Sequence, residues 1–412
     1  MTCGIYFLMQ QPDFMDDRRS LVNRLGTIGS FTASDGDVNI CGGGLHKFDF
    51  RDLISVDNLL YAWKEFSRGK KSKKDVAHFE LNLEDNIFQL HERLSAGTWE
   101  SDPYTAFYVQ DPKLRRIHKA SVRDRVLHQA VYRTLYQIFD ESFIHDSYSS
   151  RDRKGTHRGV KRFEEFSRKV TANYSRGGFA LKCDIRKFFD SIDHSILISL
   201  LEQKIPDEKF LDLVLKIIRS FSVSPNKGLP LGNVTSQILA NVYMNELDQF
   251  MKHGLKAKYY IRYCDDFVIL HDSREYLDES IGEMKELLSK RLKLDLHPNK
   301  IFFRKIHQGV DFLGYVSLPG YRVLRTRTKN RMIKKIREAH TQYKSKIISL
   351  EQFKQILASY AGMLSHCKSR KIKKLIREGI FMLYSSHVCP TTYDCKNPLR
   401  PSHSGREGCS AH

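Results

Sequence analysis

The chain has 412 residues, which is enough for two or three domains, and it carries a formal net charge of +20. A basic excess of this size favours a polyanion as partner, and no apolar run approaches the roughly 20 residues of a membrane span, so no membrane contact is expected. The first residues lack the features of a signal peptide and the eight cysteines form no Cys-x-x-Cys pair, so we expect a cytoplasmic protein that binds nucleic acid.

The first part of the chain predicts a poorly defined extension, then helices and one hairpin. Residues 1–50 are rich in Gly and Asp and show weak periodicity. Apolar residues three and four apart predict helices over residues 53–66, 86–94, 122–139 and 155–170. We expect Ser121 to cap the third of these and residues 67–74 to form a basic linker. An aromatic run, an Asp-Pro turn and a basic run over residues 104–120 predict a β-hairpin.

The second part alternates strands and helices. A strand over residues 178–184 ends in Asp184, and the stretch YIRYCDDFVIL (260–270) predicts a hairpin. Further helices are predicted over residues 195–205, 207–221, 234–252 and 273–292, and further strands near Lys300 and over residues 310–324. This order is typical of a ferredoxin-like sheet with helices on one face. The last third predicts a three-helix bundle, whose first helix lies in a segment, 322–346, with ten basic residues against one acidic residue.

Two adjacent aspartates at a hairpin tip have two interpretations. A solvent-exposed turn is the common one for an Asp-Asp pair, although Cys264-Asp265-Asp266 contains no Gly to relieve a tight turn. The alternative is a pair of ligands for divalent cations, which needs a third carboxylate. Asp184 supplies one, because the first strand and the central hairpin of a ferredoxin-like sheet are neighbours. Carboxylates gathered at one place repel unless metal neutralises them, and Mg²⁺ prefers carboxylates together with substrate phosphates.

Five motifs occur in order along the chain: LKCDIRKFFDSID, GLPLGNVTSQ, YCDD, HPNKIFF and VDFLGYV. They resemble the successive palm motifs of reverse transcriptases, and KASVRDRVLHQAV resembles the fingers segment of bacterial retroelement and group II intron enzymes. The resemblance implies an α+β right-hand polymerase with fingers, a ferredoxin-like palm and a three-helix thumb. The expected parts are an N-terminal extension, fingers with part of the palm, palm, thumb and tail, over residues 1–50, 51–177, 178–322, 323–385 and 386–412.

The resemblance also implies roles for residues of the palm. Asp184 and Asp265 look like the main ligands of two Mg²⁺ ions, for which Mn²⁺ is the alternative, with Asp266 in support and the backbone carbonyl of Ile185 as a further ligand. Phe189 stands where the family keeps an aromatic gate against the ribose 2′-hydroxyl. A buried Phe beside Phe188 is the competing interpretation for that ring.

Other residues are implied to contact the incoming nucleotide or the nucleic acid. Gly232 would let backbone approach the nucleotide, and Lys300 resembles the lysine near the triphosphate. Arg115, Arg116 and Lys119 are candidates to clamp the triphosphate, with contact to the duplex or template backbone as the alternative. The segment FLGY (312–315) resembles the primer grip, and the basic helix from Thr328 resembles a thumb helix that follows the template–primer backbone.

One departure bears on the subtype. Many reverse transcriptases have Gln before the motif glycine, whereas this chain has Leu231, and the aliphatic residue before Gly-x-x-x-Ser-Gln resembles the enzymes of diversity-generating retroelements. Those enzymes copy a template RNA with errors at adenines, and their partner is a small basic accessory protein. Loss of an amide contact would loosen base selection. Retron, defence-associated and group II intron-derived enzymes are the alternatives, and the short segment after Leu383 leads us to expect no RNase H or endonuclease domain.

The resemblance therefore implies an RNA-directed DNA polymerase that takes template RNA, a primer or cDNA end and dNTPs. A protein of another class, an RNA-binding or splicing-assisting palm without catalysis, would be favoured by loss of one of the three aspartates, and all three are present. A sheet that stacks RNA bases would carry surface aromatic residues in its strands, where this chain has carboxylates.

Overall fold

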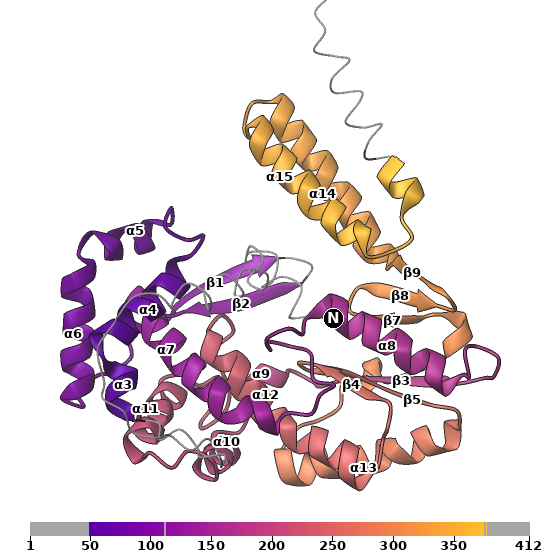
Figure 1. The fold of residues 1–412 in the computed structure, drawn as a ribbon, viewed down its shortest axis with the longest axis horizontal. Coiled ribbons are helices and arrows are strands. Elements are labelled where there is room, and N and C mark those ends of the chain that lie inside the picture. The colour runs from indigo at the N-terminus through magenta and orange to yellow at the C-terminus, as the bar shows by residue number, and fades with distance from the viewer. Residues whose placement is uncertain (1–48, 111–112, 375, 377–412) are drawn as a thin grey trace, which may run out of the picture. The chain divides into compact units, whose positions relative to one another are not determined.

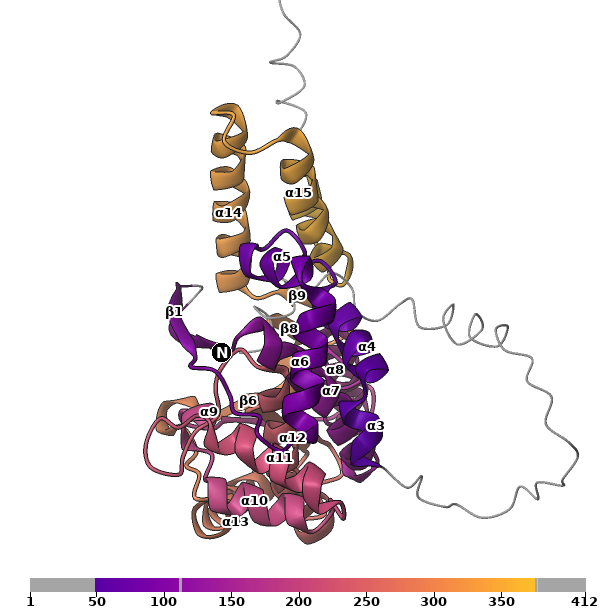
Figure 2. The same cartoon turned by 90° about the vertical axis from the view of Figure 1, so that its left-hand side faces the viewer.

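The computed structural model of the chain describes residues 49–110, 113–374 and 376. Its contacts divide the chain into two units, residues 1–334 and 335–412, which are described here separately (Figure 1). Helices and strands are mixed in the first unit, so the predicted α+β class is confirmed. Helices over residues 50–95 lie on the left of Figure 1, with the strands of residues 179–184 and 260–271 on the right, and they face the viewer in Figure 2.

The first helices differ in detail from the expectation. They are α3 (Phe50–Ile54), α4 (Val56–Ser67), α5 (Lys74–Leu81), α6 (Leu83–Ser95) and α7 (Val122–Phe139). The helix expected over residues 53–66 is interrupted, because the Ser55 hydroxyl accepts a hydrogen bond from the Asn58 N–H at 3.3 Å and so caps a new helix. The expected linker already contains the first residue of α5. The predicted cap at Ser121 is confirmed, since its hydroxyl accepts from the Asp124 N–H at 3.2 Å.

The predicted hairpin over residues 104–120 is present. Its strands β1 (Thr105–Gln110) and β2 (Leu114–Lys119) are antiparallel, and Tyr108 lies opposite Arg116. The Asp-Pro turn, residues 111 and 112, lies outside the described residues. Since alternate residues of a strand share a face, Leu114, Arg116 and His118 lie on one side of the hairpin and Arg115 and Lys119 on the other.

The central sheet has four antiparallel strands in the order β4-β5-β3-β6. They are β3 (Phe179–Asp184), β4 (Tyr260–Tyr263), β5 (Asp266–His271) and β6 (Phe302–Lys305). If the four strands are numbered in chain order, they lie side by side in the sheet as second, third, first and fourth. This is the ferredoxin-like arrangement expected from the sequence. The first strand and the tip of the central hairpin are neighbours, with Asp184 directly opposite Asp266.

Helices cover both faces of this sheet. They are α8 (Thr156–Val170), α9 (Phe188–Ser191), α10 (His194–Glu202), α11 (Glu208–Arg219), α12 (Val234–Gln249) and α13 (Arg274–Leu292), with short turns at Asp140–Ser142, Phe250–Gly254, Pro298–Lys300 and Ile306–Gln308. Leu181 and Ile269 point into the main core that α12 and α13 share. The expectation of helices on one face is incomplete, because α8 contacts β4 and β5, and the strands lie between α8 and α13 in Figure 1.

A second, three-stranded sheet follows, with β7 (Val310–Phe312), β8 (Tyr315–Leu318) and β9 (Tyr321–Leu324) in that order. Helix α14 (Thr326–Lys344) begins soon afterwards and ends within the second unit. In that unit Tyr343 of α14 stacks on Phe353 of α15 (Leu350–Ser365), with ring centroids 5.6 Å apart. Ser349 and Gln352 form a capping box at the start of α15. The third helix of the expected bundle lies largely outside the described residues, as does the expected tail.

Candidate active site

Three carboxylates meet where β3 ends and the β4–β5 hairpin turns. Asp184 is the last residue of β3, and Asp266 is the first of β5 and its register partner. Asp265 lies in the two-residue turn between Tyr263 and Asp266, and its carbonyl accepts a hydrogen bond from the Ile185 N–H at 3.2 Å. Asp184 and Asp266 are almost completely buried, whereas Asp265 is half-buried. The structure therefore brings together the three aspartates on which the sequence argument depends.

Each of the two buried carboxylates has a lysine as counterion. The Lys300 Nζ lies 2.5 Å from Asp184 Oδ1, and the Lys182 Nζ lies 3.1 Å from Asp266 Oδ2. Lys182 also donates to the backbone carbonyl of Asp311 at 3.1 Å, which ties β3 to the β7–β8 hairpin. Lys300 was expected near the triphosphate of a nucleotide, and in this structure its ammonium is held by a carboxylate.

The electrostatics of the site favour a cation or a proton. Burial, followed by the nearby carboxylates of Asp184 and Asp266, raises the pKa of Asp265 to about 6. Burial also raises the pKa of Asp266, although the Lys182 ammonium opposes this. A carboxyl group in this position loses its proton more readily when a positive charge is close by.

The donor set fits a hard divalent cation, for which carboxylate oxygens are the preferred ligands. Among the described residues, no group of three or more Asp, Glu, His or Cys side chains is arranged so that it could hold a metal ion. Asp266 Oδ1 is buried and has no hydrogen-bond partner among the described residues, and burying such an oxygen is costly unless a positive charge compensates. The lysines Lys182 and Lys300 supply that charge here.

The two phenylalanines after β3 differ in burial. Phe188 is 3% exposed and belongs to the core, whereas Phe189 is half-buried and packs edge-on against it with ring centroids 5.4 Å apart. The Phe189 carbonyl accepts from the Leu229 N–H at 2.8 Å, which joins α9 to the loop before α12. Of the two rings, only that of Phe189 is placed to meet a ligand at the surface.

The same loop contacts the β1–β2 hairpin. The Leu231 carbonyl accepts from the His118 N–H at 3.0 Å, and the His118 ring packs at a tilt against that of Phe221, with centroids 4.6 Å apart. Gly232 has a φ of +128°, and a Cβ added there would lie 3.1 Å from the His118 carbonyl oxygen. The glycine is thus required by the approach of β2 to this loop, which is a reason that the sequence did not reveal.

The three basic candidates of β2 have different surroundings. Lys119 pairs with Asp75 of α5 at 2.8 Å, so it holds the hairpin to the helices. Arg115 is half-buried on the same side of the hairpin. Arg116 is exposed on the side of His118, and it makes no ion pair with any described residue. Arg116 is therefore the candidate whose guanidinium is available to a phosphate.

The FLGY segment forms the turn between β7 and β8. Phe312 and Tyr315 are 1% and 2% exposed, and Phe312 packs against Phe163 of α8. The turn residues Leu313 and Gly314 both have positive φ values, +48° and +88°. Its aromatic side chains are core residues, so any contact with nucleic acid there falls to the turn itself.

Two charged residues of the site escaped the sequence argument. Lys182 is a lysine in an otherwise apolar strand, and Arg262 is an arginine in the apolar run before Cys264. The sequence did signal these residues, because each is a charged residue within a strand expected to be buried. Lys and Arg are rarely buried unless they are paired with an opposite charge. Their partners lie far along the chain, which is why the pairing was not visible.

A ferredoxin-like sheet with acidic residues at a strand end and a hairpin tip defines the palm of a nucleic acid polymerase. The sequence profile of the family described as "Reverse transcriptase (RNA-dependent DNA polymerase)" matches residues 110–317, half of the chain. The chain belongs to that family, and the resemblance noted from its motifs is confirmed.

The relatives include two bacterial proteins. The chain is 24% identical to Protein YkfC of Escherichia coli K12 over an alignment of 266 positions, and the match covers 55% of this chain and 69% of YkfC. It is 24% identical over 303 residues to the group II intron-encoded protein LtrA of Lactococcus lactis subsp. cremoris, covering 56% of this chain and 49% of LtrA. The chain thus spans about half the length of LtrA.

A solved structure of telomerase from Candida albicans, with a fragment of telomeric RNA, matches with a TM-score of 0.42 and 11% identity. The match covers 59% of this chain and 51% of the telomerase chain. Within the described residues, none of the helices is long and apolar enough to cross a membrane.

Proposed function

We propose that this chain is an RNA-directed DNA polymerase that makes cDNA from an RNA template and uses Mg²⁺. The observation that carries the proposal is the meeting of Asp184 at the end of β3 with Asp265 and Asp266 at the hairpin tip. Family membership supports a polymerase dependent on divalent metal in general, and the choice of Mg²⁺ follows from the all-oxygen donor set.

Asp184 and Asp265 would hold two Mg²⁺ ions together with the Ile185 carbonyl, and Asp266 would support them. Bound ions at such a site activate the attacking 3′-hydroxyl and stabilise the leaving oxygen. The chain's own residues hold the ligands in place: the Ile185 N–H fixes the Asp265 carbonyl, and Lys182 fixes Asp266. Lys300 would leave Asp184 and turn to the triphosphate, to which an ammonium can give a proton.

The nucleotide would lie between the fingers hairpin and the loop before α12. Arg116 would bind the triphosphate with its exposed guanidinium, ahead of Arg115 and Lys119. The half-buried ring of Phe189 would stand against the 2′ position of the sugar and select deoxynucleotides. Leu231 would line the nascent base pair, because its backbone is held against β2 by His118.

Template RNA and the primer end are the proposed nucleic acid partners. The exposed Arg327 and its basic neighbours on α14 suit contact with phosphates, and the β7–β8 turn suits contact with the primer. Within the family we favour the error-prone enzyme of a diversity-generating retroelement, on the residue at position 231. A small basic accessory protein and a cytoplasmic location belong to that proposal.

The relatives favour a second candidate within the same class. LtrA is by name a group II intron-encoded protein, so an enzyme of group II intron type is the alternative to the diversity-generating subtype. Error patterns separate the two, because only the diversity-generating reading expects an excess of errors opposite adenine.

Primer extension on an RNA template tests the function. Asp265→Asn should abolish extension in Mg²⁺, because an amide is a far weaker ligand for a hard cation, while template binding stays within about twofold. The matched control is Asp272→Asn, since Asp272 directly follows β5 and its side chain is 75% exposed. Retained extension by the Asp265 variant, or equal loss in both variants, would contradict the assignment.

A further inference from the structure

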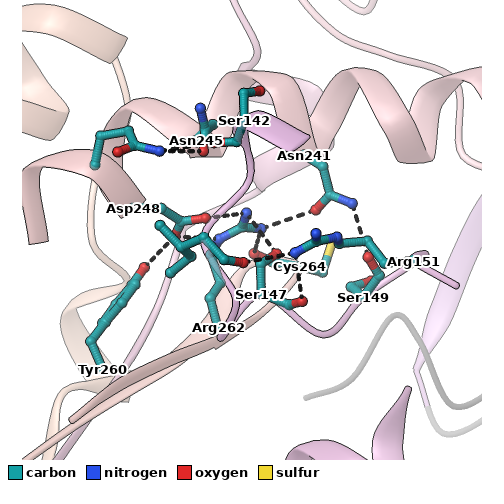
Figure 3. Close-up of polar contacts among 12 residues, drawn as sticks. Ser142, Ser147, Ser149, Arg151, Asn241, Asn245, Asp248, Tyr260, Arg262 and Cys264 are labelled. Atoms are coloured by element: carbon teal, nitrogen blue, oxygen red, sulfur yellow. Dashed lines mark hydrogen bonds and ion pairs between the residues drawn. The ribbon is translucent and has the colours of Figure 1, made fainter. Parts of the chain in front are cut away.

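The arginine of the hairpin, Arg262, is completely buried and uses every hydrogen-bond donor of its guanidinium. Its Nε and Nη2 donate to the two oxygens of Asp248 at 2.7 and 2.6 Å. The second Nη2 hydrogen goes to Ser147 Oγ at 3.1 Å, and Nη1 donates to Asn241 Oδ1 at 3.2 Å and to the Cys264 carbonyl at 3.1 Å. Figure 3 shows these contacts converging on the arginine from α12, the turn after β4 and the segment before α8.

A buried ion pair of this kind is weak evidence for stability, because desolvation offsets the attraction between the charges. Asp248 is itself 0% exposed and accepts a further hydrogen bond from the Tyr260 hydroxyl at 2.7 Å. The network is therefore complete at both ends, with an aspartate and a planar five-donor cation in fixed orientation. Such a network determines position, and the only part of the hairpin turn that it touches is the carbonyl of Cys264.

Cys264 is the strained residue of this turn. Its φ is +58°, a left-handed backbone conformation that favours glycine and that residues with a side chain rarely adopt. The turn contains only Cys264 and Asp265, so the peptide group between them sets where the Asp265 carboxylate points. Arg262 holds the carbonyl before Asp265, and the Ile185 N–H holds the carbonyl of Asp265 itself. Both peptide groups next to the acidic residue are thus held by donors from outside the turn.

We propose that Arg262 is a positioning residue for the polymerase reaction: it locks the strained Cys264–Asp265 peptide so that Asp265 is presented in one orientation. The inference rests on the proposed function, since Asp265 is the residue positioned. Asp248 acts one step further away, because it orients the guanidinium that holds the turn.

The test is Arg262→Lys, compared with Arg151→Lys. A lysine keeps the charge beside Asp248 but lacks the planar fork, so it cannot also reach the Cys264 carbonyl. Arg151 is a matched control: it is 7% exposed and its Nε donates to Asp140 at 2.6 Å, and no contact joins it to residues 263–266 in the described structure. Both variants should lose thermal stability to a similar degree.

Only the Arg262 variant should lose turnover. A small displacement of a reacting group can cost about 100-fold, so we expect kcat to fall by that factor while KM for dNTP and template affinity change less than about threefold. Adding Cys264→Gly to Arg262→Lys should recover about tenfold, because glycine adopts the positive φ without being held. Equal kcat in the two single variants, or no recovery with glycine, would overturn the proposal.

A second readout does not depend on polymerase activity. In the intact protein, the rate at which a maleimide modifies Cys264 can be followed by peptide mass spectrometry, and it should rise several-fold in Arg262→Lys and not in Arg151→Lys. If the wild-type chain fails to extend primers, the proposed function fails while this readout still tests the lock. An unchanged modification rate would reject the lock even in an active enzyme.

Discussion

Lys300 Nζ lies 2.5 Å from Asp184 Oδ1, across 116 positions of the sequence. The lysine comes from the turn before β6 and the aspartate from the end of β3, and the two backbones are joined as well, since the His297 N–H donates to the Asp184 carbonyl at 2.8 Å. An ammonium therefore lies beside a proposed metal ligand.

This relationship predicts competition between the lysine and the metal. Lys300→Ala should lower the Mg²⁺ concentration for half-maximal activity by about fivefold, because a partly buried ion pair of about 1 kcal/mol no longer has to be broken. The same variant should lower kcat, since the proposed proton donor to the leaving group is lost. Mg²⁺ titration of primer extension measures both. The control is Lys305→Ala, which changes an exposed lysine on β6. A lower Mg²⁺ concentration for half-maximal activity in both variants would contradict the competition.

Phe189 should decide between deoxynucleotides and ribonucleotides. Phe189→Ala is expected to raise the efficiency of ribonucleotide incorporation at least tenfold, because the ring no longer obstructs a 2′-hydroxyl, with little loss of folding stability. Single-nucleotide insertion assays give the ratio. Phe188→Ala should instead cost about 3–5 kcal/mol of stability, since Phe188 is a core residue. A larger gain in ribonucleotide use from the Phe188 variant would show that the wrong ring has been chosen.

The side chain at position 231 should affect fidelity. In the parent chain we expect an excess of errors opposite template adenine, and Leu231→Gln should reduce it about fivefold, because one added hydrogen bond is worth about 1 kcal/mol. The loop should stay in place, since His118 binds the backbone carbonyl of residue 231 and not its side chain. Sequencing of cDNA copied from a mixed RNA tests this.

Two results would limit the interpretation of position 231. If the parent shows no excess at adenine, even with an accessory protein present, the diversity-generating subtype fails and the group II intron, retron and defence-associated alternatives take its place. If errors are abundant and unchanged in the glutamine variant, the subtype survives and the explanation through Leu231 does not.

His128 should make the folded chain sensitive to acid. Burial lowers the pKa of this α7 histidine from 6.5 to about 3, and neither ring nitrogen has a hydrogen-bond partner within the described residues. Between these two values the unfolded chain binds a proton that the folded chain does not. The contribution of His128 to the free energy of unfolding is therefore fully present above pH 6.5 and falls by up to about 1.4 kcal/mol per pH unit below it.

Denaturant unfolding at a series of pH values measures this slope. His128→Leu should flatten the dependence between pH 3 and pH 6.5, whereas His78→Leu, which removes a histidine from the surface, is the control. A slope that is the same in wild type and in His128→Leu would show that the core accepts the protonated ring.

Local patterns in the sequence determined most of the helices, the hairpins and the order of strands along the chain. Each of these depends on residues within a few positions of one another. Ser121 is an example, since its hydroxyl caps a helix by binding the N–H of Asp124, only three positions later. The break at Ser55 depends on a cap of the same local kind, which the helical spacing of the surrounding apolar residues concealed. Helix α5 was missed because propensity near a basic linker is weak, and packing decided the outcome.

Only the tertiary structure decided how the candidate site is held. The order of motifs led to Asp184, Asp265 and Asp266, but nothing local indicates that Lys182 neutralises Asp266, that Gly232 must admit the His118 carbonyl, or that Arg262 and Asp248 lock the turn. These contacts join residues from separate strands and helices, and their energies depend on burial and on orientation. A sequence specifies both only through the fold, since a charge that is harmless in water needs a partner once the core has closed around it.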